Sequence, residues 1–190
     1  MLQYYQGTLF GDNSEGDYGL EPLLDWEMSW ILRSCANKNE QRLRPRFYHQ
    51  CRCILNKLLG WEGKKNYIDY DVESVRVWRQ WKHIDLVAEI MIDGELFVLA
   101  LEDKAYTNMT EIQRNQYPRI VREHYKDKTD NIRFVVITMF DTHEAGFTKM
   151  SDCVKGSDWV EVFSIVVLPD WEADNYTESD LFNEFWFAHV

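Results

Sequence analysis

Two alternating apolar segments that flank Asp93-Gly94 constrain the fold more than any other feature of the sequence. From Ile84 to Ile92, every second residue is apolar, and from Glu95 to Leu101 the same period places three apolar residues on one side: Phe97, Leu99 and Leu101. A period of two is that of a β-strand with one buried face. Asp-Gly is a preferred pair in two-residue hairpin turns. The sequence therefore predicts a β-hairpin.

The open end of this hairpin carries charged residues in a defined register. A two-residue turn at Asp93-Gly94 places Asp85 opposite Glu102, with both side chains on one face. Lys104 follows Glu102 by two residues and points the same way. Two adjacent carboxylates repel, so a positive charge must lie between or beside them. The alternative is a surface hairpin end with an ordinary Glu–Lys salt bridge, because Glu-x-Lys is a common pattern.

Such a group has the elements of a site for phosphodiester hydrolysis. A hard divalent cation suits two converging carboxylates. Bound cations assist this reaction by polarising the phosphate and lowering the pKa of water. Lys104 would add positive charge near the scissile phosphate, and the backbone carbonyl of Asp103 is a further candidate ligand.

The rest of the chain alternates between helical and strand patterns. Helices are expected from Leu20 to about Leu32, from about Arg46 to Leu59, from about Thr110 to Lys126 with Thr110 as cap and Pro118 inside, and from Thr177 to Trp186 with Thr177 as N-cap. Further strands are expected over 72–81, 132–139 and 160–168. This order predicts an α/β fold in which helices flank a central mixed sheet. We expect a single domain over residues 1–190, with its core from about 20 to 168.

Composition narrows the possible partners. The chain has 190 residues, of which 45% are hydrophobic, so a sizeable core is expected. No apolar run reaches the roughly 18 residues of a membrane span. The formal net charge is −11, which argues against tight nonspecific binding to nucleic acid. It leaves open an enzyme with a carboxylate-held metal, or a partner protein that supplies the nucleic-acid contacts.

For the segment from His49 to Cys53, a zinc site is the weaker of two interpretations. Cys51 and Cys53 form a CxC pattern after His49, but no matching pair lies elsewhere. Cys51 falls on the helical stripe of Phe47 and Ile54, where it is expected to be a small core residue. Residues 1–10 lack a basic segment followed by an apolar one, so no secretion signal is expected. Free thiols in a reducing cytoplasm are the simplest interpretation.

Asp85, the hairpin, Glu102-Asp103-Lys104 and a following helix together resemble the PD-(D/E)XK nuclease superfamily. Gln113 and Tyr117 also match the QxxxY pattern of its RecB-like members. The resemblance extends roughly from residue 20 to residue 139. One departure is Ile84, which stands where the family has a proline before its first aspartate.

The resemblance implies a restriction-endonuclease-like core and a nuclease that uses Mg²⁺ or Mn²⁺ to hydrolyse DNA. The implied catalytic residues are Asp85, Glu102, Lys104, Gln113 and Tyr117. The implied metal ligands are Asp85, Glu102, Asp103 and Glu27. In this family the first core helix often adds a glutamate to the metal site, and Glu27 lies on the apolar stripe of the first expected helix, where a carboxylate needs a partner.

Two alternatives remain at this point. One is a catalytically degenerate member of the superfamily that binds protein or nucleic acid without cutting. The other is an unrelated α/β interaction protein in which the hairpin charges are incidental. Nucleic acid, most simply DNA, is the expected partner under the leading hypothesis, and the sequence leaves open a homodimer or a protein partner.

Overall fold

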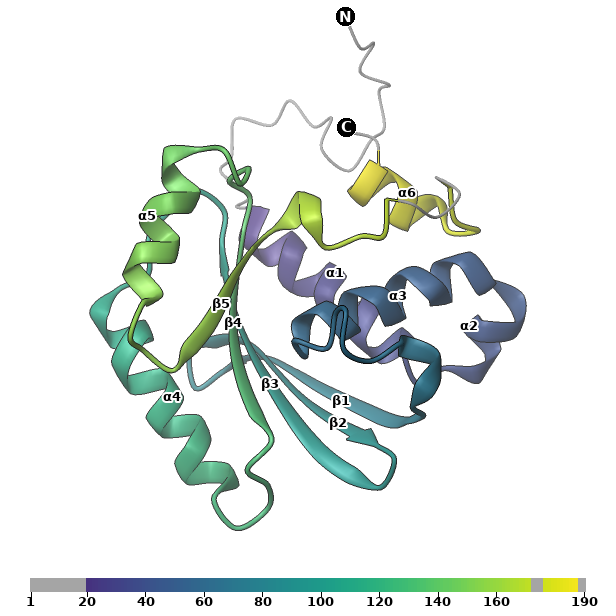
Figure 1. Cartoon of the computed structure of the whole chain (residues 1–190), viewed down its shortest axis with the longest axis horizontal. Coiled ribbons are helices and arrows are strands. Elements are labelled where there is room, and N and C mark those ends of the chain that lie inside the picture. Colours follow the sequence, from purple (N-terminus) through teal and green to yellow (C-terminus); the bar gives the residue numbers. More distant parts are fainter. Residues whose placement is uncertain (1–19, 172–175, 188–190) are drawn as a thin grey trace, which may run out of the picture.

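The computed structural model describes residues 20–171 and 176–187 and contains a five-stranded sheet with helices on both faces (Figure 1). The strands are β1 (Val72–Trp81), β2 (Ile84–Ile92), β3 (Glu95–Lys104), β4 (Ile132–Thr138) and β5 (Trp159–Ser164). The helices are α1 (Leu20–Ser34), α2 (Lys38–Leu43), α3 (Pro45–Leu58), α4 (Glu111–Tyr125), α5 (Ala145–Val154) and α6 (Asp180–Phe187). Two short 3₁₀ helices are η1 (Tyr67–Asp69) and η2 (Ile165–Val167).

The sheet is mixed, as predicted. Its strand order is β1-β2-β3-β4-β5, in which β1, β2 and β3 are antiparallel neighbours. β4 runs parallel to β3, and β5 runs parallel to β4. Parallel neighbours require a crossover connection, which α4 provides for the first pair and α5 for the second. The predicted fold class is therefore confirmed.

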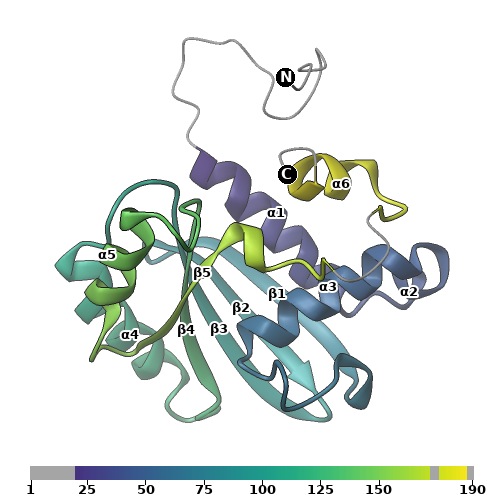
Figure 2. The ribbon, with the colours of Figure 1, turned by 45° about the horizontal axis from the view of Figure 1, so that its top comes forward.

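Side-chain alternation on β3 divides the core into two layers. Leu99 and Leu101 face one cluster of buried residues, together with residues of α1, α3 and α6. Val98 and Ala100 face the second cluster, together with residues of α4 and α5. Figures 1 and 2 show α1, α3 and α6 on one side of the sheet and α4 and α5 on the other. Consecutive residues at the end of β3 consequently point toward different helices.

Tertiary context accounts for the elements that differ from the sequence predictions. α5 was not predicted, because Gly146, Ser151 and Asp152 weaken its helical pattern. The strand expected over 160–168 ends at Ser164 and continues as η2. Ser164 pairs with Thr138, the last residue of β4, so the following residues have no partner strand. The short helix α2 was also missed; Asn37 caps it by accepting a hydrogen bond from Asn39 N.

The helix caps agree with the sequence in one case and not in the other. Thr110 caps α4 in a capping box with Gln113, as predicted, and α4 continues through Pro118. α6 begins later than predicted, and its cap is Ser179, whose hydroxyl accepts from Phe182 N at 3.3 Å. The predicted cap, Thr177, instead holds the preceding turn by accepting from Ser179 N at 3.1 Å.

In the part of the chain that the structure describes, no helix combines the length and apolar character needed to cross a membrane.

The predicted hairpin register is present. Leu86 pairs with Leu101 and Ile92 pairs with Glu95, which leaves Asp93 and Gly94 as the two-residue turn. Both turn residues have positive φ, 50° for Asp93 and 82° for Gly94, as in a type I′ turn. A second turn of this kind, at Lys82-His83, joins β1 to β2.

The Gly94 turn provides a test of this register. Among the described residues, and apart from Gly94 and its two chain neighbours, no atom lies within 4 Å of a Cβ built at Gly94, so a substitution there adds backbone strain without a clash. Gly94→Val is expected to lower the free energy of unfolding by about 1 to 2 kcal/mol, because a β-branched residue disfavours positive φ. Gly94→Asn should cost less, because asparagine adopts this region more readily. Urea denaturation of both variants measures the difference, and equal stabilities would contradict the turn type.

Candidate active site

Glu102 and Lys104 lie at the end of β3 on the face covered by α4. Glu102 is fully buried, and 6% of the surface of Lys104 is exposed. Lys104 Nζ lies 2.8 Å from Glu102 Oε1 and also donates to the Asp103 carbonyl at 2.8 Å. The ammonium therefore contacts a carboxylate and a carbonyl at once.

Asp85, near the start of β2, completes this group from the neighbouring strand. Its Oδ2 accepts a hydrogen bond from Asp103 N at 2.8 Å and lies 3.6 Å from Lys104 Nζ. Asp85 and Glu102 therefore lie on either side of the same Lys104 ammonium, as the hairpin register implied. We call Asp85, Glu102 and Lys104 the carboxylate–lysine cluster.

Burial and charge repulsion both act on Glu102. Burial raises the pKa of its carboxyl to about 8, and the nearby Asp85 adds to this rise, while Lys104 partly offsets it. Within the described residues, Glu102 Oε2 has no hydrogen-bond partner. A buried carboxylate oxygen without a partner is costly, so this atom is suited to an additional positive ligand.

Gln113 connects the cluster to the first turn of α4. Its Oε1 accepts from Thr110 N at 2.8 Å in the capping box, which fixes the amide group. Its Nε2 then donates to Glu102 Oε1. Tyr117, one turn further along α4, is half-buried; burial raises the pKa of its hydroxyl, and the charges of Glu102 and Asp85 raise it further. Both residues of the QxxxY pattern therefore lie beside the cluster.

Two polar residues that were not predicted, Gln80 and Asp25, support Asp85 from the α1 side. Gln80 Nε2 donates to Asp85 Oδ1 at 3.0 Å and to Asp25 Oδ2 at 3.1 Å. A signal for Asp25 was present in the sequence, because it precedes Met28 by three residues and Leu32 by seven and so shares their helical stripe.

The Asp103 side chain points away from the carboxylate–lysine cluster. Asp103 alternates with Glu102 along β3, so its buried carboxyl faces α1 and lies beside that of Asp25. Burial and the neighbouring Asp25 together hold the pKa of Asp103 well above its usual range. Burial also raises the pKa of Asp25. The Asp103 backbone carbonyl, in contrast, accepts a hydrogen bond from Lys104 Nζ.

Glu27, also expected at the metal site, occupies a different environment. It is fully buried, in agreement with its predicted position on the apolar stripe. Burial raises the pKa of its carboxyl to about 8, and the indole of Trp186 on α6 partly offsets this rise. Asp25, in contrast, accepts a hydrogen bond from Gln80, which also donates to Asp85. Asp25 is therefore an α1 carboxylate that reaches the cluster through Gln80, while Glu27 as a metal ligand stays a prediction.

A family model described as the PD-(D/E)XK nuclease superfamily matches residues 28–178. The chain belongs to this superfamily, and the resemblance stated from the sequence is confirmed at this level. A search of curated proteins found no match, nor did a search of solved structures. The alternative of an unrelated interaction protein is therefore excluded, while the QxxxY assignment remains a prediction.

The buried Glu27 leads to a prediction about pH-dependent stability. Its folded-state pKa of about 8 exceeds the ordinary value of 4.5, so the folded protein binds more protons than the unfolded chain between these values. The free energy of unfolding should accordingly fall as pH rises from about 5 to 8. Glu27→Gln should reduce this slope and be more stable than the parent at pH 8, by on the order of 2 kcal/mol.

Urea denaturation at several pH values measures this slope. Glu123→Gln is the matched control, because Glu123 is a fully exposed glutamate. If Glu27→Gln leaves the pH dependence of the free energy of unfolding unchanged, the raised pKa of Glu27 is contradicted.

Proposed function

We propose that the protein is a nuclease that hydrolyses DNA phosphodiester bonds with Mg²⁺ or Mn²⁺. The observation that supports this most strongly is the convergence of Asp85 and Glu102 on one ammonium, beside a buried Glu102 oxygen that has no partner among the described residues. Membership of the PD-(D/E)XK nuclease superfamily supports the same reaction class.

The donor set fits a hard divalent cation. The Asp85 carboxylate, the Glu102 carboxylate and the Asp103 carbonyl are all oxygen ligands, which Mg²⁺ and Mn²⁺ prefer. Lys104 Nζ already contacts an oxygen of each group, so their negative potential is focused on one position. A divalent ion held by these three groups would supply polarisation of the scissile phosphate and activation of water.

The remaining residues position and complement this donor set. Gln113 orients Glu102 through its amide, and Gln80 orients Asp85. Lys104, which follows Glu102 on the same face, stabilises the negative charge that develops on the phosphate oxygens. Asp25 shares Gln80 with Asp85 and so acts as a positioning residue.

A catalytically inactive binding protein with the same fold is the second candidate. Two observations favour it: the net charge of −11 and the complete burial of Glu102. The intact carboxylate–lysine cluster favours the nuclease. Cleavage assays on several nucleic acids with Mg²⁺ or Mn²⁺ distinguish the two candidates.

Replacing Lys104 should separate catalysis from metal binding. Lys104 supplies no negative charge, and an ammonium beside a cation repels it, so Lys104→Ala should bind Mn²⁺ at least as tightly as the parent. Its cleavage rate should fall by on the order of 100- to 1000-fold, the usual cost of losing one preorganised partner of the transition state. Asp85→Asn should lose metal binding and cleavage together.

Calorimetric titration with Mn²⁺ and plasmid cleavage test both variants, with Lys149→Ala as an exposed-lysine control on α5. Cleavage by Lys104→Ala at the parent rate would refute the catalytic role. If the parent cuts no substrate, the inactive binding protein becomes the better account.

Asp25 and Glu27 should differ in their effect on metal affinity. Asp25→Asn disturbs the Gln80 bridge to Asp85, and loss of such outer-shell support typically weakens metal binding by about 10-fold or more. Glu27→Gln should leave Mn²⁺ affinity unchanged, because Glu27 lies beside Trp186. The opposite ranking in the same calorimetric titration would restore Glu27 as the α1 contributor.

A further inference from the structure

A second group of metal-binding residue types lies on other elements of the fold. His49 and Cys53 are one turn apart on α3, and Asp170 belongs to the segment after η2. Asp170 Oδ2 lies 2.8 Å from His49 Nε2, and Cys53 Sγ lies 3.6 Å from the same nitrogen. One ligand atom from each residue lies within 4.8 Å of the other two. None of the three belongs to the carboxylate–lysine cluster.

The geometry favours a shared ion over a nucleophile relay. In a catalytic Cys–His–Asp triad, the thiol and the carboxylate face opposite nitrogens of the imidazole. Here Asp170 lies on Nε2, and Cys53 Sγ lies between the two nitrogens, 3.6 Å from Nε2 and 4.0 Å from Nδ1. Nδ1 in turn lies 2.9 Å from the Tyr67 hydroxyl, so neither nitrogen is reserved for the thiol. A histidine that binds a metal through one nitrogen characteristically uses the other for such an orienting hydrogen bond.

The third ligand is held in place through its backbone. The buried side chain of Gln50 on α3 donates to the Asp170 carbonyl at 2.9 Å and accepts from Asp170 N at 2.8 Å. Lys57 Nζ donates to the carbonyls of Val167 at 2.8 Å and Pro169 at 3.2 Å. These contacts fix the segment against α3, so little ordering remains when a ligand binds.

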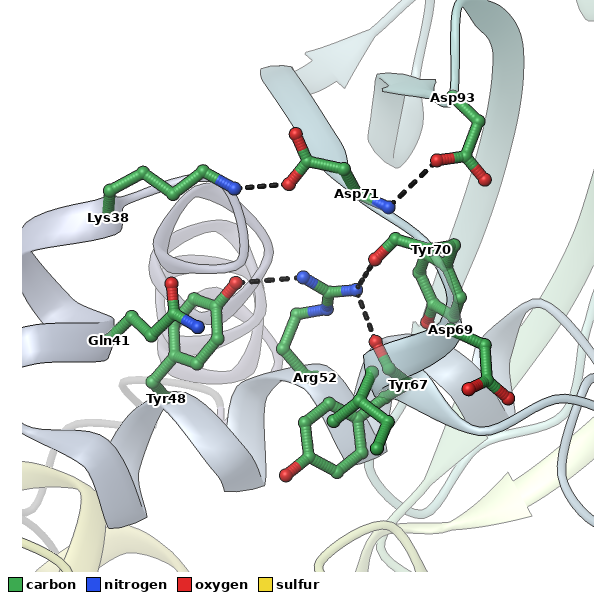
Figure 3. A pocket seen from close by; sticks show the side chains of 10 residues that line it. Lys38, Gln41, Tyr48, Arg52, Tyr67, Asp69, Tyr70, Asp71 and Asp93 are labelled. Carbon is green, nitrogen blue, oxygen red and sulfur yellow. Dashed lines mark hydrogen bonds and ion pairs between the residues drawn. The ribbon is translucent and has the colours of Figure 1, made fainter.

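The orienting residue Tyr67 is also anchored. Figure 3 shows the guanidinium of Arg52, on α3, between Tyr48, Tyr67 and Tyr70. It donates to the Tyr48 hydroxyl at 2.8 Å, to the Tyr67 carbonyl at 2.6 Å and to the Tyr70 carbonyl at 2.8 Å. Because Arg52 is buried, this network fixes η1 relative to α3 and hence the Tyr67 hydroxyl relative to His49.

We propose that His49, Cys53 and Asp170 form a binding site for a single Zn²⁺ ion. Nitrogen, sulfur and oxygen ligands together suit this borderline-soft cation, and tetrahedral ligands at its usual bond lengths lie roughly 3.4 Å apart. All three residues line a cleft of about 850 Å³ together with Lys57 and Glu62. Water from this cleft would supply the fourth ligand. On binding, the Cys53 thiol releases its proton to solvent, and His49 carries its proton on Nδ1, facing Tyr67.

Cobalt provides a direct optical test on the full chain after chelator treatment. A bound thiolate gives Co²⁺ an intense charge-transfer band that oxygen-only sites lack. We expect this band to saturate at one Co²⁺ per chain and to disappear when Zn²⁺ is added. Cys53→Ser should abolish the band, while His49→Gln and Asp170→Asn should weaken binding by at least about 10-fold.

Two controls distinguish this site from the rest of the protein. Cys153→Ser should keep the band, because Cys153 is a comparably half-buried thiol on α5, on the other face of the sheet. Glu102→Gln should also keep it, because Glu102 belongs to the carboxylate–lysine cluster. Circular dichroism and urea denaturation identify any variant that fails to fold, and the conservative Asp170→Asn then remains informative.

Absence of the band in the parent protein at saturating Co²⁺ would overturn the proposal. Its persistence in Cys53→Ser, or its loss in Cys153→Ser, would also do so. A cobalt signal that depends on Glu102 and not on Cys53 would assign the ion to the carboxylate–lysine cluster and refute a second site.

Discussion

The repulsion between Asp85 and Glu102 is the constraint around which this end of the sheet is organised. Burial alone disfavours the charge on Glu102, and Asp85 disfavours it further. Lys104 balances the two carboxylates, and donors approach from both sides, Gln113 from α4 and Gln80 from β1. A pair of carboxylates held together at this cost is typical of a site that binds positive charge, and much less typical of a purely structural contact.

The alternation of β3 extends the site through the sheet. Glu102 and Lys104 face α4, while the Asp103 carboxyl faces α1 and lies beside Asp25. The Asp103 backbone belongs to the cluster at the same time, because its N–H donates to Asp85 and its carbonyl accepts from Lys104. One residue thus connects the carboxylate–lysine cluster to a second pair of carboxyls on the opposite face. A displacement of α1 would consequently shift the Asp85 carboxylate, because Asp25 on α1 is connected to it through Gln80 and through Asp103.

Features set by local periodicity could be predicted from the sequence, and features set by distant contacts could not. The two-residue turn and the alternation of β2 and β3 fix which residues face each other, so the register that aligns Asp85 with Glu102 was predictable. Asp25 and Glu27 both lie on the buried side of α1, and only the position of Trp186 and Gln80 distinguishes them. The end of β5 depends on where β4 ends. The contact between His49 and Asp170 joins residues that are 121 positions apart in the sequence, so no local pattern indicates it.

The two candidate metal sites differ in ligand chemistry, and this difference determines how they would share the available ions. The carboxylate–lysine cluster offers oxygen ligands alone, which suit Mg²⁺ and Mn²⁺. His49 and Cys53 on α3 and Asp170 after η2 offer imidazole, thiolate and carboxylate, which favour Zn²⁺. A given site generally binds Zn²⁺ more tightly than Mn²⁺, whatever its ligands. An excess of Zn²⁺ would therefore also compete for the carboxylate–lysine cluster. A filled second site would also connect α3 to the segment after η2, and so stabilise the layer of helices on which α1 and Asp25 depend.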